Sequence, residues 1–290
     1  MTCYRCGHAP CDCSDGITLF SADCRDVLPT LAAVDHVITD PPYNVSKRSG
    51  RANTTIGKVK RKHTIHGARR DGSSLYRDIV RDFGDWDHAW DAAPFLVEAK
   101  RLIRQGGSLI AFTSEFLFAP YLESGLDHRS LLFWHKSNPA PNFRGQVVRS
   151  IEMAVWQTQG GKWVFNAGGY RPNVWSGPNI NGWMCENTAE KREHPTQKPE
   201  WLIKTWVDVF TDPGETILDP FAGSGTTLVA AKMLGRKAIG IELEERWCEV
   251  TAKRLDATTT PLPGLVVERG EQARMTLDAR AVNPPALEVT

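Results

Sequence analysis

The sequence predicts an α/β fold, a doubly wound and mainly parallel sheet of seven strands with helices on both faces. Short β-branched apolar runs alternate with segments of helical period, as in strand–helix–strand units. Two of these runs end in an acidic residue, Asp40 and Asp219. The second is followed by a glycine turn that opens a helix, an arrangement typical of nucleoside-binding α/β folds.

The bulk composition is that of an ordinary soluble protein. The 290 residues suffice for one large α/β domain with insertions, with 41% apolar and 24% charged residues. No stretch approaches about 18 uncharged apolar residues and no apolar run follows a basic start, so we expect no membrane partner and no secretion signal. Seven cysteines in such a chain indicate reduced thiols rather than a disulfide framework.

Residues 1–14 are predicted to form a zinc knuckle. Their four cysteines, Cys3, Cys6, Cys11 and Cys13, are enough to close a tetrahedral site and to stabilise a terminus that has no core of its own. The Cys-x-Cys half is tighter than the usual pair, and His8 is an alternative ligand. The competing interpretation is free thiols at a frayed terminus.

Residues 15–156 are predicted to form the catalytic half of the domain. The expected strands are 17–20, 37–39, 108–112, 131–134 and 153–156, and the expected helices are 22–29 and 94–102. We expect the antiparallel member of the sheet among the last two strands. Asp23, at the end of the first strand, can cap the following helix and also accept a hydrogen bond from a nucleobase.

The sequence Asp40-Pro41-Pro42-Tyr43 ends the second strand, and the rest of the candidate site is arranged around it. Ligands collect at the carboxyl ends of strands in open α/β sheets. Two prolines fix the backbone and remove two donors, which holds Asp40 and the nearby carbonyls rigidly. Tyr43 adds a flat aromatic face. A planar substrate with an exocyclic amino group fits this corner; the alternative is an ordinary proline turn.

Residues 45–75 are predicted to contact a phosphate backbone. Nine lysines and arginines and no acid occur between 45 and 70, with no hydrophobic period. A solvated linker is the alternative, which a long unstructured insertion within a domain disfavours. The candidate contacts are Lys47, Arg48, Lys60, Arg61 and Lys62.

Residues 194–255 are predicted to form the cofactor-binding half. Strands at 216–219 and 237–242 enclose the glycine turn and a helix at 226–234, and another helix is expected at 201–210. Glu242 follows Asp219 by 23 residues, near the spacing at which an acid binds ribose hydroxyls. With no third glycine and no phosphate-loop lysine, a cofactor with an adenosine and no phosphates is expected, which describes S-adenosylmethionine.

Three motifs together resemble the DNA amino-methyltransferases. They are Asp-Pro-Pro-Tyr at 40–43, His-Pro-Thr-Gln-Lys-Pro at 194–199 and Asp-Pro-Phe-Ala-Gly-Ser-Gly-Thr at 219–226. Their order is that of the β group, with the catalytic motif first and the cofactor motif last, and the resemblance covers about 17–255. It implies the S-adenosylmethionine-dependent methyltransferase fold in permuted order, with an inserted target-recognition region at 157–193.

The resemblance also implies roles for individual residues. The cofactor pocket would be formed by Asp23, Thr196, Lys198, Asp219, Phe221, Ala222, Gly223, Gly225, Thr226 and Glu242. Arg144, a candidate DNA contact, and Glu152 belong to a neighbouring conserved block of the family. The cysteine cluster, the basic arm and a C-terminal extension at 256–290 lie outside the common pattern. The aromatic and Asn-rich region at 157–193 can read bases or form the core of a small subdomain.

The expected reaction is methyl transfer to N6 of an adenine flipped out of duplex DNA. Tyr43 would stack on the base, while Asp40 and the Pro41 carbonyl would accept hydrogen bonds from its amino group. Asp rather than Ser at position 40 favours adenine over the N4 amino group of cytosine, the alternative. An inactive DNA-binding module and an RNA methyltransferase are further alternatives. Candidate partners are double-stranded DNA, a second copy of the chain and a cognate restriction endonuclease, in the cytoplasm at the nucleoid.

Overall fold

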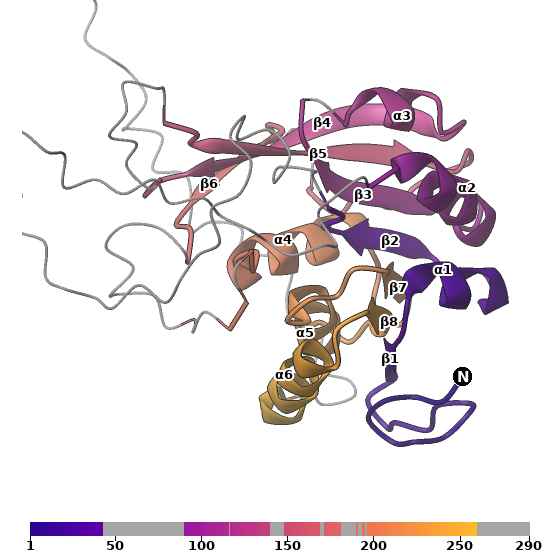
Figure 1. Ribbon diagram of the computed structural model, residues 1–290. Coiled ribbons are helices and arrows are strands. Elements are labelled where there is room, and N and C mark those ends of the chain that lie inside the picture. The colour runs from indigo at the N-terminus through magenta and orange to yellow at the C-terminus, as the bar shows by residue number, and fades with distance from the viewer. Residues whose placement is uncertain are drawn as a thin grey trace, which may run out of the picture.

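A single mixed sheet runs through the part of the chain that the computed structural model describes, which comprises residues 1–42, 90–115, 117–139, 148–168, 171–180, 190, 193–194 and 196–259 (Figure 1). The strands are β1 (Ile17–Ser21), β2 (His36–Thr39), β3 (Ser108–Thr113), β4 (Asp127–Lys136), β5 (Ile151–Thr158), β6 (Val174–Gly177), β7 (Thr216–Asp219) and β8 (Lys237–Glu242). The helices are α1 (Cys24–Val27), η1 (Leu28–Thr30, a 3-10 turn), α2 (Ala92–Leu102), α3 (Ala119–Leu122), α4 (Glu200–Phe210), α5 (Thr226–Met233) and α6 (Glu245–Ala257).

The strand order is β1-β8-β7-β2-β3-β5-β4-β6. The first five strands are parallel neighbours, and β5 is antiparallel to both β3 and β4, as expected for the end of this sheet. The predicted doubly wound, mainly parallel fold is therefore confirmed. Within the described residues the sheet has eight strands, one more than expected.

The additional strand, β6, lies within the Gly- and Asn-rich region at 157–193. It pairs in parallel with β4, and the Phe133 amide donates to the Asn173 carbonyl at 2.8 Å just before the strand begins. The Asn173 side chain also donates to the Leu131 carbonyl at 2.8 Å. The four residues Val-Trp-Ser-Gly show no alternation of apolar and polar residues and are too few to be recognised as a strand from sequence, so the pairing of β6 depends on the long strand beside it.

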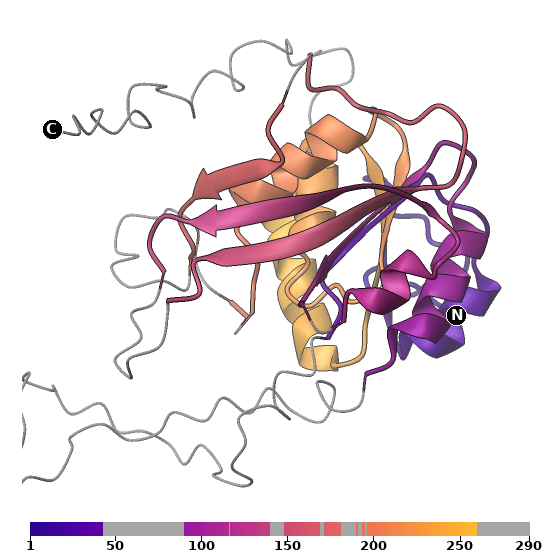
Figure 2. The same cartoon turned by 90° about the horizontal axis from the view of Figure 1, so that it is seen from above.

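Helices α4, α5 and α6 lie on one side of the sheet and α1, α2 and α3 on the other (Figure 2). An apolar layer between the helices and each face of the sheet forms the core. Alternate strand residues face opposite layers: Ile38 packs with α4, α5 and α6, whereas Val37 packs with α1, α2 and α3. Both faces of the central strands are covered, which explains why β2 and β3 are buried at every position.

A buried polar cluster joins the amino ends of the central strands. The Ser108 amide donates to Nδ1 of His36 at 3.1 Å, so Nε2 carries the proton and donates to Glu215 at 2.8 Å. Arg104 also pairs with Glu215. Although burial acts to raise it, the hydrogen bonds from His36 and from the Asp212 amide hold the pKa of Glu215 at about 2. Ion pairs and hydrogen bonds therefore fix the amino ends of these strands. Their carboxyl ends lie at the opposite edge of the sheet.

The predicted segment boundaries can be compared with the elements. β5 continues to Thr158 and α6 to Ala257, so each passes the expected boundary by two residues. Residues 159–168 begin at the amino edge of β3, where the Gln159 and Gly107 backbones are joined at 3.0 Å. Among the described residues, no helix has the length and apolar character to cross a membrane.

Candidate active site

A pocket of about 720 Å³ lies at the carboxyl ends of β1, β2, β7 and β8. A volume of this size is typical of sites for small ligands. The lining includes residues from all three sequence motifs, namely Asp40 and Pro42 from the first, Thr196 and Lys198 from the second, and the turn after β7 from the third. The parallel pairing of β2 with β7 brings the first and third motifs together.

The glycine turn between β7 and α5 forms one wall of the pocket. Gly223 and Gly225 have φ angles of 53° and 76°, in the left-handed region. A Cβ at Gly225 would lie 2.4 Å from the Thr251 methyl carbon, whereas nothing lies within 4 Å of one at Gly223, which lines the pocket. Gly225 therefore packs against α6, and Gly223 leaves open space toward the pocket.

Glu242 closes the turn from the end of β8. One carboxylate oxygen accepts the Gly223 amide and the other accepts the Glu244 amide, each at 2.8 Å. Burial raises the pKa of this carboxyl above its usual value. A carboxylate has about four acceptor positions, so each oxygen keeps a lone pair for a ligand hydroxyl after these two bonds. The geometry agrees with the ribose-binding role expected from the sequence.

Asp219 joins the two halves of the site. Its carboxylate accepts from Oγ1 of Thr39 at 2.7 Å and from the Phe221 amide at 3.2 Å. Burial raises its pKa to about 6. It lines the pocket, and these hydrogen bonds hold the end of β2 against the glycine turn.

An aromatic group forms a second wall. Phe221 contacts Trp90 and Phe95 edge-to-face, with ring centroids 5.0 and 5.6 Å apart. All three rings line the pocket, and Phe95 comes from the buried face of α2. Trp90 is missed as a site residue by the sequence analysis because the residues before α2 lack a period. Such flat apolar surfaces suit an aromatic ring of a ligand.

Asp40 is held by a charged cluster that reaches the pocket wall. Nζ of Lys198 lies 2.5 Å from the Asp40 carboxylate, 3.3 Å from that of Glu152 and 4.6 Å from the Phe112 ring centroid. Lys136 pairs with Glu152 at 2.5 Å. Burial opposes the charged form of Lys198, but the two carboxylates outweigh it and raise its pKa. Burial likewise opposes the charge on Glu152, yet the two lysines keep its pKa below the usual value.

The remaining lining comes from α1, the second motif and α6. Asp23 caps α1 by accepting the Arg25 amide at 2.9 Å, and its hydrogen bonds with the Arg25 side chain lower its pKa. His194 packs on Trp247 at 4.3 Å and accepts from the Thr196 amide at 3.2 Å. Both expected roles of Asp23 are compatible with this geometry.

Most of the predicted cofactor residues line the pocket. These are Asp23, Thr196, Lys198, Asp219, Phe221, Ala222, Gly223, Thr226 and Glu242. Pro41 and Gly225 lie behind this lining, and the four N-terminal cysteines gather away from it, at the β1 edge of the sheet. Tyr43 and the candidate DNA contacts Lys47, Arg48, Lys60, Arg61, Lys62 and Arg144 lie outside the described residues, so their roles stay predictions.

Comparison with known proteins gives one consistent family. A model of the DNA methylases of the N6/N4 type matches residues 34–254. Type II methyltransferase M.HinfI of Haemophilus influenzae is 31% identical over 256 residues, which cover 82% of this chain and 68% of that protein. Type II methyltransferase M2.LlaDCHI of Lactococcus lactis subsp. cremoris is 38% identical over 241 residues, covering 79% and 84%.

Solved structures share the fold at lower identity. The M1.HpyAVI–SAM complex has a TM-score of 0.57 at 24% identity and covers 82% of this chain and 100% of that one. The PvuII DNA methyltransferase, titled cytosine-N4-specific, has a TM-score of 0.58 at 15% identity, with 82% and 86% covered. These likenesses support the fold assignment.

Proposed function

Because the chain belongs to the N6/N4 DNA methylase family, we propose that it transfers a methyl group from S-adenosylmethionine to N6 of an adenine flipped out of duplex DNA. The observation that carries this proposal is that a candidate acceptor for an amino group and a candidate nucleoside-binding turn line the same pocket. Asp40, which can accept from an amino group, lies at the end of β2, and the glycine turn with Glu242 lies at the ends of the neighbouring β7 and β8.

The pocket fits the cofactor. Gly223 leaves space where a side chain would project, and Glu242 keeps acceptor capacity for ribose hydroxyls. Trp90 and Phe221 offer apolar surface for the adenine, with Asp23 beside them. When bound, the cofactor supplies an electrophilic methyl group on a sulfonium. M1.HpyAVI, whose solved complex contains this cofactor, shares the fold.

Asp40 is the residue that we propose to act on the target base. Its carboxylate and the Pro41 carbonyl accept hydrogen bonds from the amino group, which draws the nitrogen toward tetrahedral geometry and localises its lone pair for in-line attack. The ion pair with Lys198 holds Asp40 in position. Catalysis then depends on orientation and fixed charge rather than on a covalent intermediate with the protein.

The choice of base and of partners forms part of the proposal. Asp at position 40, in the Asp-Pro-Pro-Tyr motif of the β group, favours adenine. N4 of cytosine is the second candidate, since the PvuII enzyme of that specificity has the same fold. The relatives are named type II methyltransferases, so we also propose a cognate restriction endonuclease. The proposed substrate is double-stranded DNA, located in the cytoplasm at the nucleoid, and a second copy of the chain is a candidate partner.

Methyl transfer from labelled S-adenosylmethionine to unmethylated genomic DNA, followed by nucleoside analysis, tests the proposal. The expected product is N6-methyladenine in one short sequence motif. The Asp40→Ala variant should form none of this product but should still bind the cofactor. Label in N4-methylcytosine would refute the choice of adenine. Transfer to RNA in preference to duplex DNA would refute the proposed substrate. An Asp40→Ala variant that loses DNA binding rather than turnover would refute the proposed activity.

A further inference from the structure

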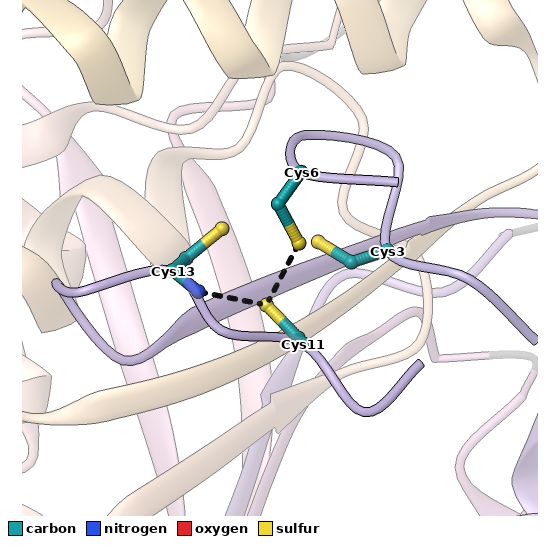
Figure 3. Close-up of side chains that lie close together, drawn as sticks. All are labelled: Cys3, Cys6, Cys11 and Cys13. Carbon is teal, nitrogen blue, oxygen red and sulfur yellow. Dashed lines mark hydrogen bonds between the residues drawn. The ribbon is translucent and has the colours of Figure 1, made fainter. Parts of the chain in front are cut away.

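The four N-terminal cysteines, which the active site does not use, converge on one point (Figure 3). Their sulfur atoms all lie within 4.8 Å of one another, and the Cys6 and Cys11 sulfurs are 3.8 Å apart. Four sulfurs bound to zinc at about 2.3 Å define a tetrahedron with edges of about 3.8 Å. The spacing therefore matches a single metal ion, whereas a disulfide requires sulfurs about 2 Å apart.

The backbone around the cysteines supports this arrangement. Gly7, with a φ angle of 76°, turns the chain after Cys6, and its amide donates to the Cys3 carbonyl at 2.8 Å. The Cys13 amide lies 3.5 Å from the Cys11 sulfur and points its hydrogen toward it, a contact that stabilises a thiolate. His8 is exposed and pairs with Asp12 at 2.7 Å, so the four-sulfur set is the more shielded ligand group.

The cysteine loop covers the open edge of the sheet. β1 is the first strand in the sheet order and pairs with β8 on one side. On its other side, the Tyr4 amide donates to the Leu19 carbonyl at 2.7 Å, and Arg5 donates to the Ile17 carbonyl at 3.1 Å. Residues adjacent to the cysteines thus satisfy edge carbonyls that would otherwise face solvent or another chain.

A buried ion network continues from the loop to the cofactor half of the domain. Arg5 pairs with Asp15 at 2.9 Å, and Asp15 pairs with Lys232 of α5 at 2.9 Å. Lys232 also donates to the Leu255 carbonyl in α6 at 2.8 Å. The loop is therefore joined to the two helices that pack behind the glycine turn, and β1 itself leads into Asp23 of the pocket.

We propose that Cys3, Cys6, Cys11 and Cys13 bind one structural zinc ion, which fixes the N-terminal loop against the edge of β1. Binding replaces the thiol protons with the metal, and the four sulfurs remain reduced. Zinc is favoured because a single tetrahedral set of thiolates is the usual ligand group of structural zinc sites. The ion acts on stability and on the position of β1, at a distance from the reaction.

Metal analysis of the full chain, purified without a polyhistidine tag, tests the proposal. The expected result is one zinc per chain, falling to near zero in Cys6→Ser and in Cys11→Ser. Cys24→Ser, which changes a cysteine outside the cluster, should keep one zinc per chain. Because the cluster variants can fail to fold, cobalt titration of the zinc-depleted wild-type chain is a second measurement, and it should give the spectrum of a tetrahedral four-thiolate site.

Three results would overturn the proposal. They are a metal-free chain whose cluster thiols all react as ordinary thiols, iron in place of zinc, and a disulfide between cluster cysteines in freshly purified protein. Chelation should also lower the melting temperature of the wild-type chain. The melting temperature of the Cys24→Ser variant should fall by at least as much on chelation. Zinc content is measured independently of methyl transfer, so the outcome does not depend on the proposed function.

Discussion

Replacing Lys198 with methionine removes the cation between two carboxylates and keeps the length of the side chain. Lys198 is 8% exposed, and its Nζ lies 2.5 Å from Asp40 and 3.3 Å from Glu152. At an effective dielectric constant of about 20, these contacts correspond to gross attractions of about 7 and about 5 kcal/mol. Desolvation offsets most of this, and breaking such a buried pair by removing one partner costs about 3 kcal/mol net.

The effect on turnover should follow from the position of Asp40. Without Lys198, the Asp40 carboxylate loses its contact with the buried cation, and a displacement of about 1 Å is enough to lower a rate about 100-fold. A positioning role therefore predicts a large fall in kcat and a dissociation constant for S-adenosylmethionine that changes little. A role in binding the cofactor, the role that the family resemblance implies, predicts the opposite split.

Three measurements separate these roles. Single-turnover methyl transfer gives the rate, calorimetric titration gives cofactor affinity, and urea unfolding gives stability. Lys204→Met, a substitution on α4 outside the pocket, is the matched control and should change stability by less than about 0.5 kcal/mol. A folded Lys198→Met protein with the wild-type rate would refute the argument, and Lys198→Arg should recover part of the lost rate because it restores the charge.

Three further predictions concern the pocket and the opposite end of the sheet. Gly225→Ala places a Cβ 2.4 Å from the Thr251 methyl carbon at a φ of 76°, so it should destabilise the chain by at least about 2 kcal/mol in urea unfolding. Gly235→Ala, also at positive φ but with nothing within 4 Å of its Cβ, should cost only about 1 kcal/mol; equal losses would contradict the clash. Glu242→Gln should weaken S-adenosylmethionine binding by about 10-fold or more, measured by calorimetry, since it removes a charged acceptor for the ribose; unchanged affinity would remove Glu242 from the nucleoside site. The pKa of Glu215 is depressed from 4.5 to about 2, so its stabilisation is present above pH 4.5 and is lost as pH falls toward 2. Glu215→Gln should therefore lower the free energy of unfolding at pH 7 by about 2 kcal/mol, and a difference that stays constant down to pH 3 would contradict this assignment.

The sequence predicts the fold well because the central strands of the sheet are buried on both faces. Runs such as that of β3 are apolar throughout and bounded by turn residues, so their type and position follow from local pattern. The glycine turn and Glu242 are also local, since their spacing in the chain is fixed by one strand–helix–strand unit. For this reason, most residues of the predicted cofactor site do line the pocket.

The contacts that sequence reasoning missed join distant parts of the chain. Lys198 and Asp40 are 158 residues apart, and no periodicity connects them. The hydrogen bond from Thr39 to Asp219, which joins the end of β2 to the glycine turn, spans 180 residues. β6 is too short to show a pattern, and Trp90 takes its place through contact with Phe221 rather than through any local signal.

The pairing of β1 with β8 and of β2 with β7 has a consequence for how the chain folds. The earliest strands to leave the ribosome acquire these neighbours only after the last two strands have been made. Until then β1 has no neighbouring strand and β2 has only β3 beside it, and such late, non-local pairing slows folding and exposes edges to aggregation. A nascent or truncated chain that stops before residue 216 has Asp40, Pro41 and Pro42 but lacks β7, whose Asp219 holds the end of β2. On the proposed function, activity should therefore arise only after β7 and β8 have joined the sheet.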